Sequence, residues 1–425
     1  MKRVFVLLLF IFVFSTSSCT FTKVKKTVTN PKKLEGKLTV CASTQDEASM
    51  KIVIADFKSE YPKVEIDLSL LDEEAVYNKL STDLIGNNSE VDLVAIENSY
   101  LPGLLYKYPL GFVNLSDYIS KKNYSSSNIE LITSKNGIMA MPWYEDVSVL
   151  YYRRDIFKSL GIDPMTIKTW EDYLSIGSKI KEATMDKIRL VGLNFNNSNA
   201  FKMLLNQLNA SYFDDNDKCI LGKEKAITVL TLLKQLQDSK YVNGYTDNKS
   251  LVNLLKNDSI ATIPYGGSLS GVIEKECPEE SGKWGIIKLP AFEVGGNRAG
   301  FYSSTSLMVP IVSKNIELAS EFVSFAGSDK NALLKINEDN KLMPEYAPAY
   351  DSLDFKKKSE YFAFQNINSI LIDLDNQAME VNYNNNYDEV NKMLLQAQKS
   401  VLFDNSVLRE TLTQLMNKIN NSLLG

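Results

Sequence analysis

The stretch from residue 37 to residue 97 alternates short apolar runs with amphipathic segments, and this alternation restricts the fold more than any other feature. Three runs have the length and composition of strands: KLTVCAS at 37–43, VEIDLSL at 64–70 and VDLVAIE at 91–97. The residues between the first two predict a helix, because apolar side chains recur there at intervals of three and four: Met50, Val53, Ile54, Phe57 and Tyr61. A second helix is expected to end near residues 84–85. Strands and helices in this order predict parallel βαβ units and an α/β fold.

The polar residues that follow these strands are candidates for a binding site. In parallel sheets, ligands gather at the carboxyl ends of the strands. Gln45 and Asp46 follow the first strand, and the third strand ends in Glu97 and Asn98. We therefore expect these four side chains to lie beside a ligand.

The rest of the chain predicts a helical middle, a return to strands and a helical end. Residues 169–183 and 223–239 are amphipathic, with apolar residues on one helical face. Residues 259–268 form an apolar run that breaks into a glycine turn, and further strands are expected around residues 300–310. Because strands return after the helical middle, we expect discontinuous domains. The last forty residues are expected to be helical.

Two of the predicted helices begin with a capping signal. Thr44 and Glu47 have the spacing of a capping box, and Thr169 precedes the second amphipathic helix as an N-cap. Trp170 follows that cap directly, so we expect it to pack in the core rather than bind a ligand. Trp284 is likewise expected to be structural.

Composition and charge exclude several functional classes. The chain has no histidine, which removes Ser-His-Asp and Cys-His catalysis as well as histidine-ligated metals. Its 47 Lys and Arg against 52 Asp and Glu give a formal net charge of −5, which argues against a nucleic-acid partner. The cysteines show no C-x-x-C spacing. We expect no metal site and no cofactor.

The first residues have the pattern of an export signal. Lys2 and Arg3 precede an apolar run of eleven residues, Val4–Phe14, which is shorter than the ~20 residues that a membrane-spanning helix needs. Residues 1–18 are therefore predicted to be a signal peptide. Cys19 follows small residues and resembles the lipidated cysteine of a bacterial lipobox, although Thr16 departs from that pattern. An ordinary cleaved signal with an incidental cysteine remains the alternative.

The signal is followed by a short polar leader. Residues 19–35 carry five lysines and few apolar side chains, which is typical of a flexible tether. Together these segments predict an exported protein, lipid-anchored to the outer face of the bacterial cell membrane.

The stretch MAMPWYEDVSVLYYRRD, residues 139–155, combines a strand pattern with aromatic and acidic side chains. Carboxylates accept hydrogen bonds from sugar hydroxyls, and aromatic rings pack against apolar sugar faces. Trp143, Tyr144 and Glu145 supply this mixture and are candidates to contact a ligand. Glu145 and Asp146 are consecutive on a strand and point to opposite faces, so they cannot act as a glycosidase pair.

Four passages in sequence order carry a resemblance to a known family. They are the βαβαβ start with Asp92, residues 137–173 with LYYRRD and TWEDY, residues 257–268 (NDSIATIPYGGS), and residues 283–327 with SKNIELASEFVSFAG. In this order and spacing the chain resembles the extracellular solute-binding proteins of ABC importers, of the maltose-binding-protein-like type. The resemblance covers nearly the whole chain.

The resemblance implies a two-lobed periplasmic-binding-protein fold of type II, with lobes joined by three hinge segments. One lobe would comprise residues 36–147 plus 303–342, and the other residues 148–302 plus 343–425. The implied function is capture of a sugar or related small polar solute between the lobes and its delivery to an ABC permease. The protein is expected to be a monomer.

The same resemblance places further ligand contacts. Glu145 aligns with a ligand-contacting glutamate of the family, and Tyr265 with Gly266 ends a strand where the family's loop meets the ligand. Tyr302 lies near the second crossing between lobes and is another candidate. No tryptophan follows in that loop, which argues against a large oligosaccharide platform.

Two other functions remain open. A thiaminase-I-like enzyme shares the implied fold, but it needs a nucleophilic cysteine where this chain has Asp146, and the YGGSLSG loop lacks a carboxylate base. A surface-binding protein without a small ligand is the other alternative. We expect no enzymatic activity.

Overall fold

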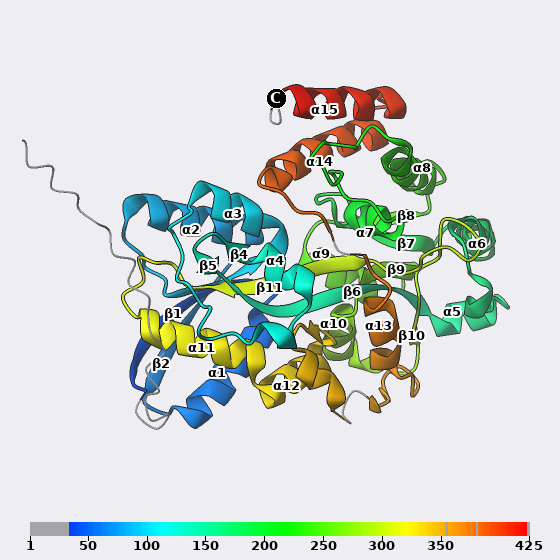
Figure 1. Cartoon of the computed structure of the whole chain (residues 1–425). Helices are drawn as coiled ribbons and strands as arrows, with labels where there is room; N and C mark the ends of the chain where they lie inside the picture. The colour runs from blue at the N-terminus through cyan, green and yellow to red at the C-terminus, as the bar shows by residue number, and fades with distance from the viewer. Residues whose placement is uncertain (1–33, 353–355, 380, 423–425) are drawn as a thin grey trace, which may run out of the picture.

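The computed structural model describes residues 34–352, 356–379 and 381–422. Its strands form one ten-stranded sheet with the order β2-β1-β3-β11-β6-β9-β7-β8, to which β10 and β12 add along β6, and a separate two-stranded sheet (Figure 1). Helices cover both faces of the large sheet in two halves, one on each side of its centre. The predictions for the signal peptide, Cys19 and most of the tether lie outside the described residues.

The first half is built on the alternation seen at the start of the sequence. β1 pairs in parallel with β2 and with β3, so the predicted βαβ units are confirmed. Two later helices, α11 and α12, pack beside α1 and complete this half. Its main elements are β1 (Gly36–Ser43), α1 (Glu47–Glu60), β2 (Val64–Leu71), α2 (Glu73–Gly86), β3 (Leu93–Glu97), η2 (Asn98–Tyr100), α3 (Leu101–Lys107), α4 (Ser126–Leu131), β4 (Thr133–Ser134), β5 (Gly137–Ile138), α11 (Ile316–Ser328) and α12 (Lys330–Asn340).

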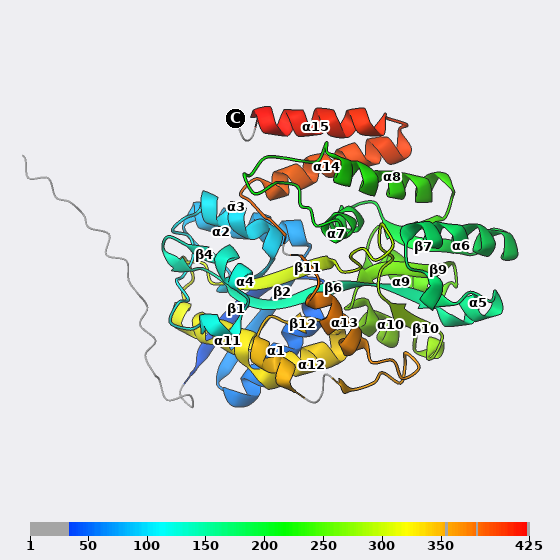
Figure 2. The ribbon, with the colours of Figure 1, turned by 45° about the vertical axis from the view of Figure 1, so that its right-hand side comes forward.

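The second half contains the helical middle and the helical end of the chain. β7 pairs in parallel with β8 and β9, and α14 and α15 stack on α8 at one end of the molecule (Figure 2). Its main elements are α5 (Arg154–Ser159), α6 (Trp170–Ala183), β7 (Arg189–Asn194), α7 (Asn199–Gln207), α8 (Glu224–Asp238), β8 (Val242–Tyr245), α9 (Asn248–Lys256), β9 (Ile260–Gly266), α10 (Leu269–Glu276), β10 (Trp284–Ile287), α13 (Ile367–Asp375), α14 (Tyr387–Phe403) and α15 (Leu408–Ser422).

Strand β6 (Met141–Arg153) runs through both halves. Its first part pairs with β11 (Phe301–Met308) and with the short β12 (Met343–Pro344), and its second part pairs with β9 and β10. Figure 2 shows β6 extending from the side of α11 towards α5. The strand therefore links the two halves covalently.

The hydrophobic core divides where the chain passes between the halves. One cluster contains β1 to β3 and ends at Tyr144 on β6, whereas Val147 belongs to a cluster of the second half. The chain also passes from one hydrophobic cluster to the other along β11, and again between Leu342 and Met343. The chain thus crosses between the halves three times, at β6, β11 and β12.

One predicted helix start is confirmed and one is wrong. Thr169 and Asp172 form a reciprocal capping box at α6, and Trp170 and Trp284 are buried as expected. At α1 the N-cap is Asp46 rather than Thr44, and no side chain caps the helix. The physical reason is that the Asp46 carboxylate turns instead towards Ser43 and Tyr144.

The three cysteines within the described residues, Cys41, Cys219 and Cys277, are buried free thiols. Over the same residues, no helix combines the length and the apolar character needed to cross a membrane.

Candidate functional site

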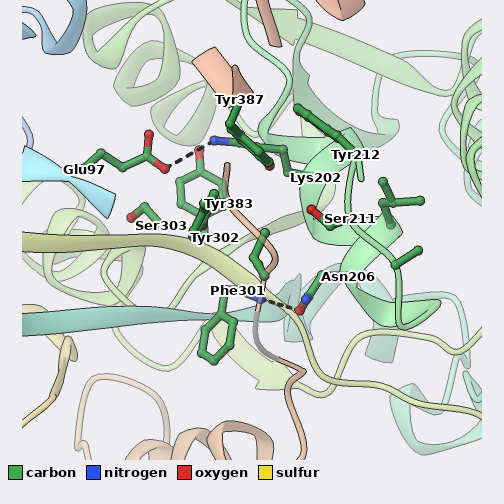
Figure 3. A pocket seen from close by; sticks show the side chains of 13 residues that line it. Glu97, Lys202, Asn206, Ser211, Tyr212, Phe301, Tyr302, Ser303, Tyr383 and Tyr387 are labelled. Atoms are coloured by element: carbon green, nitrogen blue, oxygen red, sulfur yellow. Dashed lines mark hydrogen bonds and ion pairs between the residues drawn. The ribbon is translucent and has the colours of Figure 1, made fainter. Parts of the chain in front are cut away.

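Two adjoining cavities lie where the halves meet, at the carboxyl ends of β1 and β3. The first, which we call the strand-end cavity, is lined by Ser43, Gln45, Asp46, Glu73, Val76, Ala95, Ile96, Glu97, Tyr144, Asp146, Asn199, Lys202, Ser268, Ser303, Thr305 and Leu342. The second, the tyrosine cavity, is drawn in Figure 3 and is lined by Glu97, Lys202, Leu205, Asn206, Ala210, Ser211, Tyr212, Phe301, Tyr302, Ser303, Val381, Tyr383 and Tyr387. Both halves therefore contribute side chains to each cavity.

An ion pair between Glu97 and Lys202 stands between the two cavities (Figure 3). Glu97 ends β3 in the first half, and Lys202 lies on α7 in the second. The Lys202 Nζ is 3.5 Å from Glu97 Oε1, and the side chains are only 14% and 11% exposed. The pair thus joins the halves through a largely desolvated charge contact.

A third ionisable group, Glu73 at the start of α2, belongs to the same network. Burial raises the pKa of Glu73 well above its usual value, and the nearby charge of Glu97 adds to that rise. Burial also acts to raise the pKa of Glu97, but Lys202, Glu73 and Ser99 outweigh it and lower the pKa. Ser99 Oγ donates to Glu97 at 2.6 Å. The arrangement favours a protonated Glu73 beside an ionised Glu97.

Asp46 and Tyr144 meet at the wall of the strand-end cavity. The Tyr144 hydroxyl donates to the Asp46 carboxylate, which also accepts from Ser43 Oγ at 2.8 Å. Burial raises the pKa of Asp46, and these hydrogen bonds oppose the rise. The two predicted residues therefore hold each other in place although they are 98 positions apart.

Asp146 lines the same cavity two residues after Tyr144, because side chains on one face of a strand repeat every second residue. It accepts hydrogen bonds from the backbone N–H of Ser268 at 3.0 Å and from Ser268 Oγ at 2.5 Å. Burial raises the pKa of Asp146 to about 7. A Cβ on Gly266 would lie 2.0 Å from an oxygen of Asp146, so this approach requires glycine.

Tyrosine rings line the tyrosine cavity from the second half. Tyr212 stacks on Tyr387 with ring centroids 4.4 Å apart, and Tyr383 meets Tyr387 edge-on at 4.7 Å. Tyr302 stacks on Tyr265 at 4.1 Å. Such rings offer flat apolar faces together with hydroxyl groups.

Glu145 lies on the opposite face of β6 from Tyr144 and Asp146. Its neighbours are two more carboxyl groups, Glu345 just after β12 and Asp375 at the end of α13. Burial, and then the two neighbouring acids, raise the pKa of Glu145 well above its usual value. We call these three residues the acid cluster.

The acid cluster is held by neutral hydrogen-bond donors. Asn128 Nδ2 donates to Glu345, and the Tyr350 hydroxyl donates to Asp375 at 3.0 Å. Burial raises the pKa of Glu345 to about 8. Within the described part of the chain, no ion pair joins Glu145, Glu345 or Asp375 to a cation.

The ten residues predicted from the sequence fall into two groups. Those that line a cavity are Gln45, Asp46, Glu97, Tyr144 and Tyr302. Those that line neither cavity are Asn98, Trp143, Glu145, Tyr265 and Gly266. Their role as ligand contacts stays a prediction.

Two residues of the second group are buried away from both cavities. Asn98 is buried and accepts a hydrogen bond from Ser306 Oγ at 2.7 Å. Trp143 is fully buried in the core of the first half, and its indole N–H has no hydrogen-bond partner among the described residues.

Several cavity residues were not selected from the sequence. Lys202 is an ordinary lysine on an amphipathic helix, and Tyr383 lies in the polar run NYNNNY at 382–387, which has no helix or strand pattern. Asp146 could have been predicted, because it lies two residues after Tyr144 and therefore on the same face of the strand. The arrangement as a whole offers acceptors, donors and aromatic faces from both halves, which suits binding of a hydroxylated molecule.

Comparison with known proteins identifies the family. Residues 42–333 match the model of the bacterial extracellular solute-binding proteins. The arabinooligosaccharide-binding protein of Bacillus subtilis (strain 168) is 26% identical over 364 residues, which are 83% of each chain. The lactose-binding protein of Rhizobium radiobacter is 21% identical over 343 residues, covering 79% of this chain and 81% of the relative.

Solved structures share the fold. The GacH receptor of Streptomyces glaucescens GLA.O superposes with a TM-score of 0.80 at 15% identity, over 92% of this chain and 98% of the receptor. A binding protein of B. animalis subsp. lactis Bl-04, in complex with β-1,6-galactobiose, gives 0.80 at 18% identity, over 91% and 97%. Maltose-bound T. maritima MalE3 gives 0.77 at 16% identity, over 91% and 99%. The predicted two-lobed periplasmic-binding fold of type II is confirmed, and the chain belongs to the bacterial extracellular solute-binding proteins.

Proposed function

We propose that the protein captures an oligosaccharide between its two halves and delivers it to an ABC permease. The observation that carries this proposal is the pair of adjoining cavities at the junction, lined from both halves by carboxylates, tyrosines and one lysine. The names of the relatives, which bind arabinooligosaccharides and lactose, favour a saccharide over other solutes.

The cavity chemistry suits a saccharide. Carboxylates such as Asp46 and Glu97 accept hydrogen bonds from hydroxyl groups, and bonds to an ionised acceptor are roughly twice as strong as neutral ones. Tyrosine rings pack against the C–H faces of a sugar. We propose Gln45, Asp46, Glu97, Tyr144 and Tyr302 as the ligand contacts among the predicted residues, with Asp146, Lys202 and Tyr383 added from the structure.

Binding requires the halves to move apart. The strand-end cavity offers about 50 Å³, whereas small-molecule sites of proteins typically measure about 300 Å³ or more. We propose that residues 36–147 plus 303–342 and residues 148–302 plus 343–425 are the moving lobes, with hinges at the three crossings. A ligand that contacts both lobes shifts the equilibrium towards the closed form.

We propose that residues 1–18 direct export and that Cys19 carries a lipid anchor. We also propose that the protein works as a monomer with its permease. We further propose that it binds without chemical conversion, because the family's relatives are binding proteins and a catalytic cysteine is absent from position 146.

A thermal-shift panel tests the proposal. Arabinotriose, lactose, maltose and β-1,6-galactobiose are each added to the purified protein, and positive results are confirmed by calorimetry. A ligand present at a hundred times its Kd stabilises the fold by about 2.7 kcal/mol, so at least one probe is expected to raise Tm by several degrees. If no saccharide at millimolar concentration shifts Tm or releases heat, the proposal is wrong.

A further inference from the structure

The two cavities share a single cation. Among the described residues that line them, Lys202 is the only basic one, whereas Asp46, Glu73, Glu97 and Asp146 are acidic. A ligand entering between the halves therefore meets several carboxyl groups and one ammonium group. Whether a negatively charged ligand can bind therefore depends on which group pairs with the Lys202 ammonium.

Lys202 is already engaged by a residue of the other half. Its ammonium pairs with Glu97 at 3.5 Å, and both side chains are at least 85% buried. Breaking a buried ion pair leaves an uncompensated charge in a poorly solvated place, which is strongly unfavourable. While the halves are closed, Glu97 therefore keeps Lys202 from pairing with a charged group of a ligand.

We propose that Glu97 determines the charge specificity of the cleft: by holding Lys202, it admits uncharged saccharides and rejects those that carry a carboxylate. The proposal rests on the proposed function and deepens it, since it specifies the chemical class of the saccharide. Glu97 is a specificity-determining residue, and Lys202 is the group that it controls.

A ligand carboxylate would compete with Glu97 for one ammonium group. It would have to take Lys202 from Glu97, and the released, ionised Glu97 would then lie without a cation beside the carboxylate of the ligand. Like charges at short distance in a low-dielectric site repel strongly. A neutral saccharide avoids this conflict, because the ion pair can form again when the halves close and Glu97 keeps free lone pairs that accept hydroxyl groups.

A second ion pair provides a matched control. Glu74, next to Glu73 on α2, pairs with Lys392 on α14 at 3.1 Å, so this contact also joins the two halves. Its side chains are 61% and 47% exposed, and solvent screens such a pair. Removing the charge of Glu74 alters the net charge of the protein by the same amount as removing that of Glu97, but it does so outside the two cavities.

The experiment compares two probes on three proteins. The neutral probe is whichever of arabinotriose, lactose and β-1,6-galactobiose binds the wild type most tightly, and the acidic probe is the same saccharide with its terminal primary hydroxyl oxidised to a carboxylate. Calorimetry measures both on the wild type, Glu97→Gln and Glu74→Gln. The wild type is expected to prefer the neutral probe at least a hundredfold. Glu97→Gln is expected to lower that preference at least tenfold, whereas Glu74→Gln retains it.

A further variant keeps the test decisive. Lys202→Met removes the ammonium, so it is expected to weaken binding of the acidic probe by a larger factor than binding of the neutral probe, whereas an equal loss for both probes would overturn the inference. Circular dichroism checks that each variant is folded.

The outcomes separate the inference from the proposed function. The inference is overturned if the wild type binds both probes equally, if Glu97→Gln keeps the wild-type preference within twofold, or if Glu74→Gln changes it as much. If no neutral saccharide binds the wild type, the proposed function itself fails.

Discussion

The two faces of β6 bury carboxyl groups in different ways. Tyr144 and Asp146 face the strand-end cavity, where the nearby Glu97 is paired with Lys202. One residue away, Glu145 faces Glu345 and Asp375, where neutral donors and raised pKa values replace a counter-charge.

The difference shows how one strand serves two purposes. A carboxyl group can remain buried either by pairing with a cation or by keeping its proton. The first solution applies to Glu97, whose charged carboxylate faces the cavity and suits recognition of hydroxyl groups, whereas Asp146 on the same face is held by Ser268 and has a pKa raised to about 7. The second solution leaves a compact group of acids beside the crossing at β12, where the pairing of β12 with β6 brings Glu345 close to Glu145.

The largest expected effect comes from removing the cation. Lys202→Ala leaves Glu97 buried without its partner, and such losses cost about 3–5 kcal/mol. We expect the free energy of unfolding, measured by chemical denaturation, to fall by about 3 kcal/mol. A loss below about 1 kcal/mol would contradict the view that this pair is a buried contact between the halves.

The next effect distinguishes the two faces of β6 directly. Asp146→Asn removes from the cavity face an acceptor that is charged above its pKa of about 7, and charge-assisted hydrogen bonds contribute about 1.5–3 kcal/mol, so saccharide affinity measured at about pH 8 is expected to fall at least tenfold. Glu145→Gln alters the other face and is expected to change affinity less than threefold. Calorimetry with the best saccharide probe measures both. Equal losses would instead support the sequence-based prediction that Glu145 contacts the ligand.

The acid cluster predicts a dependence of stability on pH. A carboxyl group whose pKa is higher in the folded than in the unfolded state stabilises the fold at low pH, and the contribution disappears as the pH rises through the folded-state pKa. For Glu345 this window extends from the ordinary value of 4.5 to about 8. The wild type is therefore expected to lose Tm across that range.

Glu345→Gln isolates this contribution. The amide cannot ionise, so the fall in Tm between pH 5 and pH 8 is expected to be shallower than in the wild type. Asp146, with a pKa of about 7, titrates in the same window but is present in both proteins. Parallel curves for the two proteins would show that ionisation of Glu345 does not destabilise the fold.

The smallest effect is expected at the exposed contact between the halves. Glu74→Ala removes the pair with Lys392, which keeps its second pair with Asp388, and exposed ion pairs contribute about 0–1 kcal/mol. The free energy of unfolding is expected to change by less than about 1 kcal/mol, and less still at high salt. A loss as large as that of Lys202→Ala would mean that burial does not distinguish the two contacts.

The sequence predicts much of the fold because local patterns determine it. The alternation over residues 37–97 specifies the βαβ units, and the capping box at Thr169 specifies the start of α6. The sequence wrongly predicts Thr44 as the cap of α1, because the spacing of Thr44 to Glu47 is a local pattern whereas the contact of Asp46 with Tyr144 is not.

The site is less predictable because distant segments assemble it. The period of a strand separates Glu145 from Asp146, but it does not say which of them faces a cavity. Lys202 meets Glu97 only through the approach of the two halves, and Glu345 meets Glu145 only through the pairing of β12 with β6. Local sequence patterns cannot predict such contacts between distant segments.

A crystal structure of the protein with the tightest-binding saccharide of the panel shows whether both halves bind the ligand. We expect one saccharide between the halves, with hydroxyl groups within hydrogen-bond distance of Asp46 or Glu97 on one side and against Tyr383 or Lys202 on the other. A saccharide bound to one half alone, or on the face of β6 that carries Glu145, would contradict it.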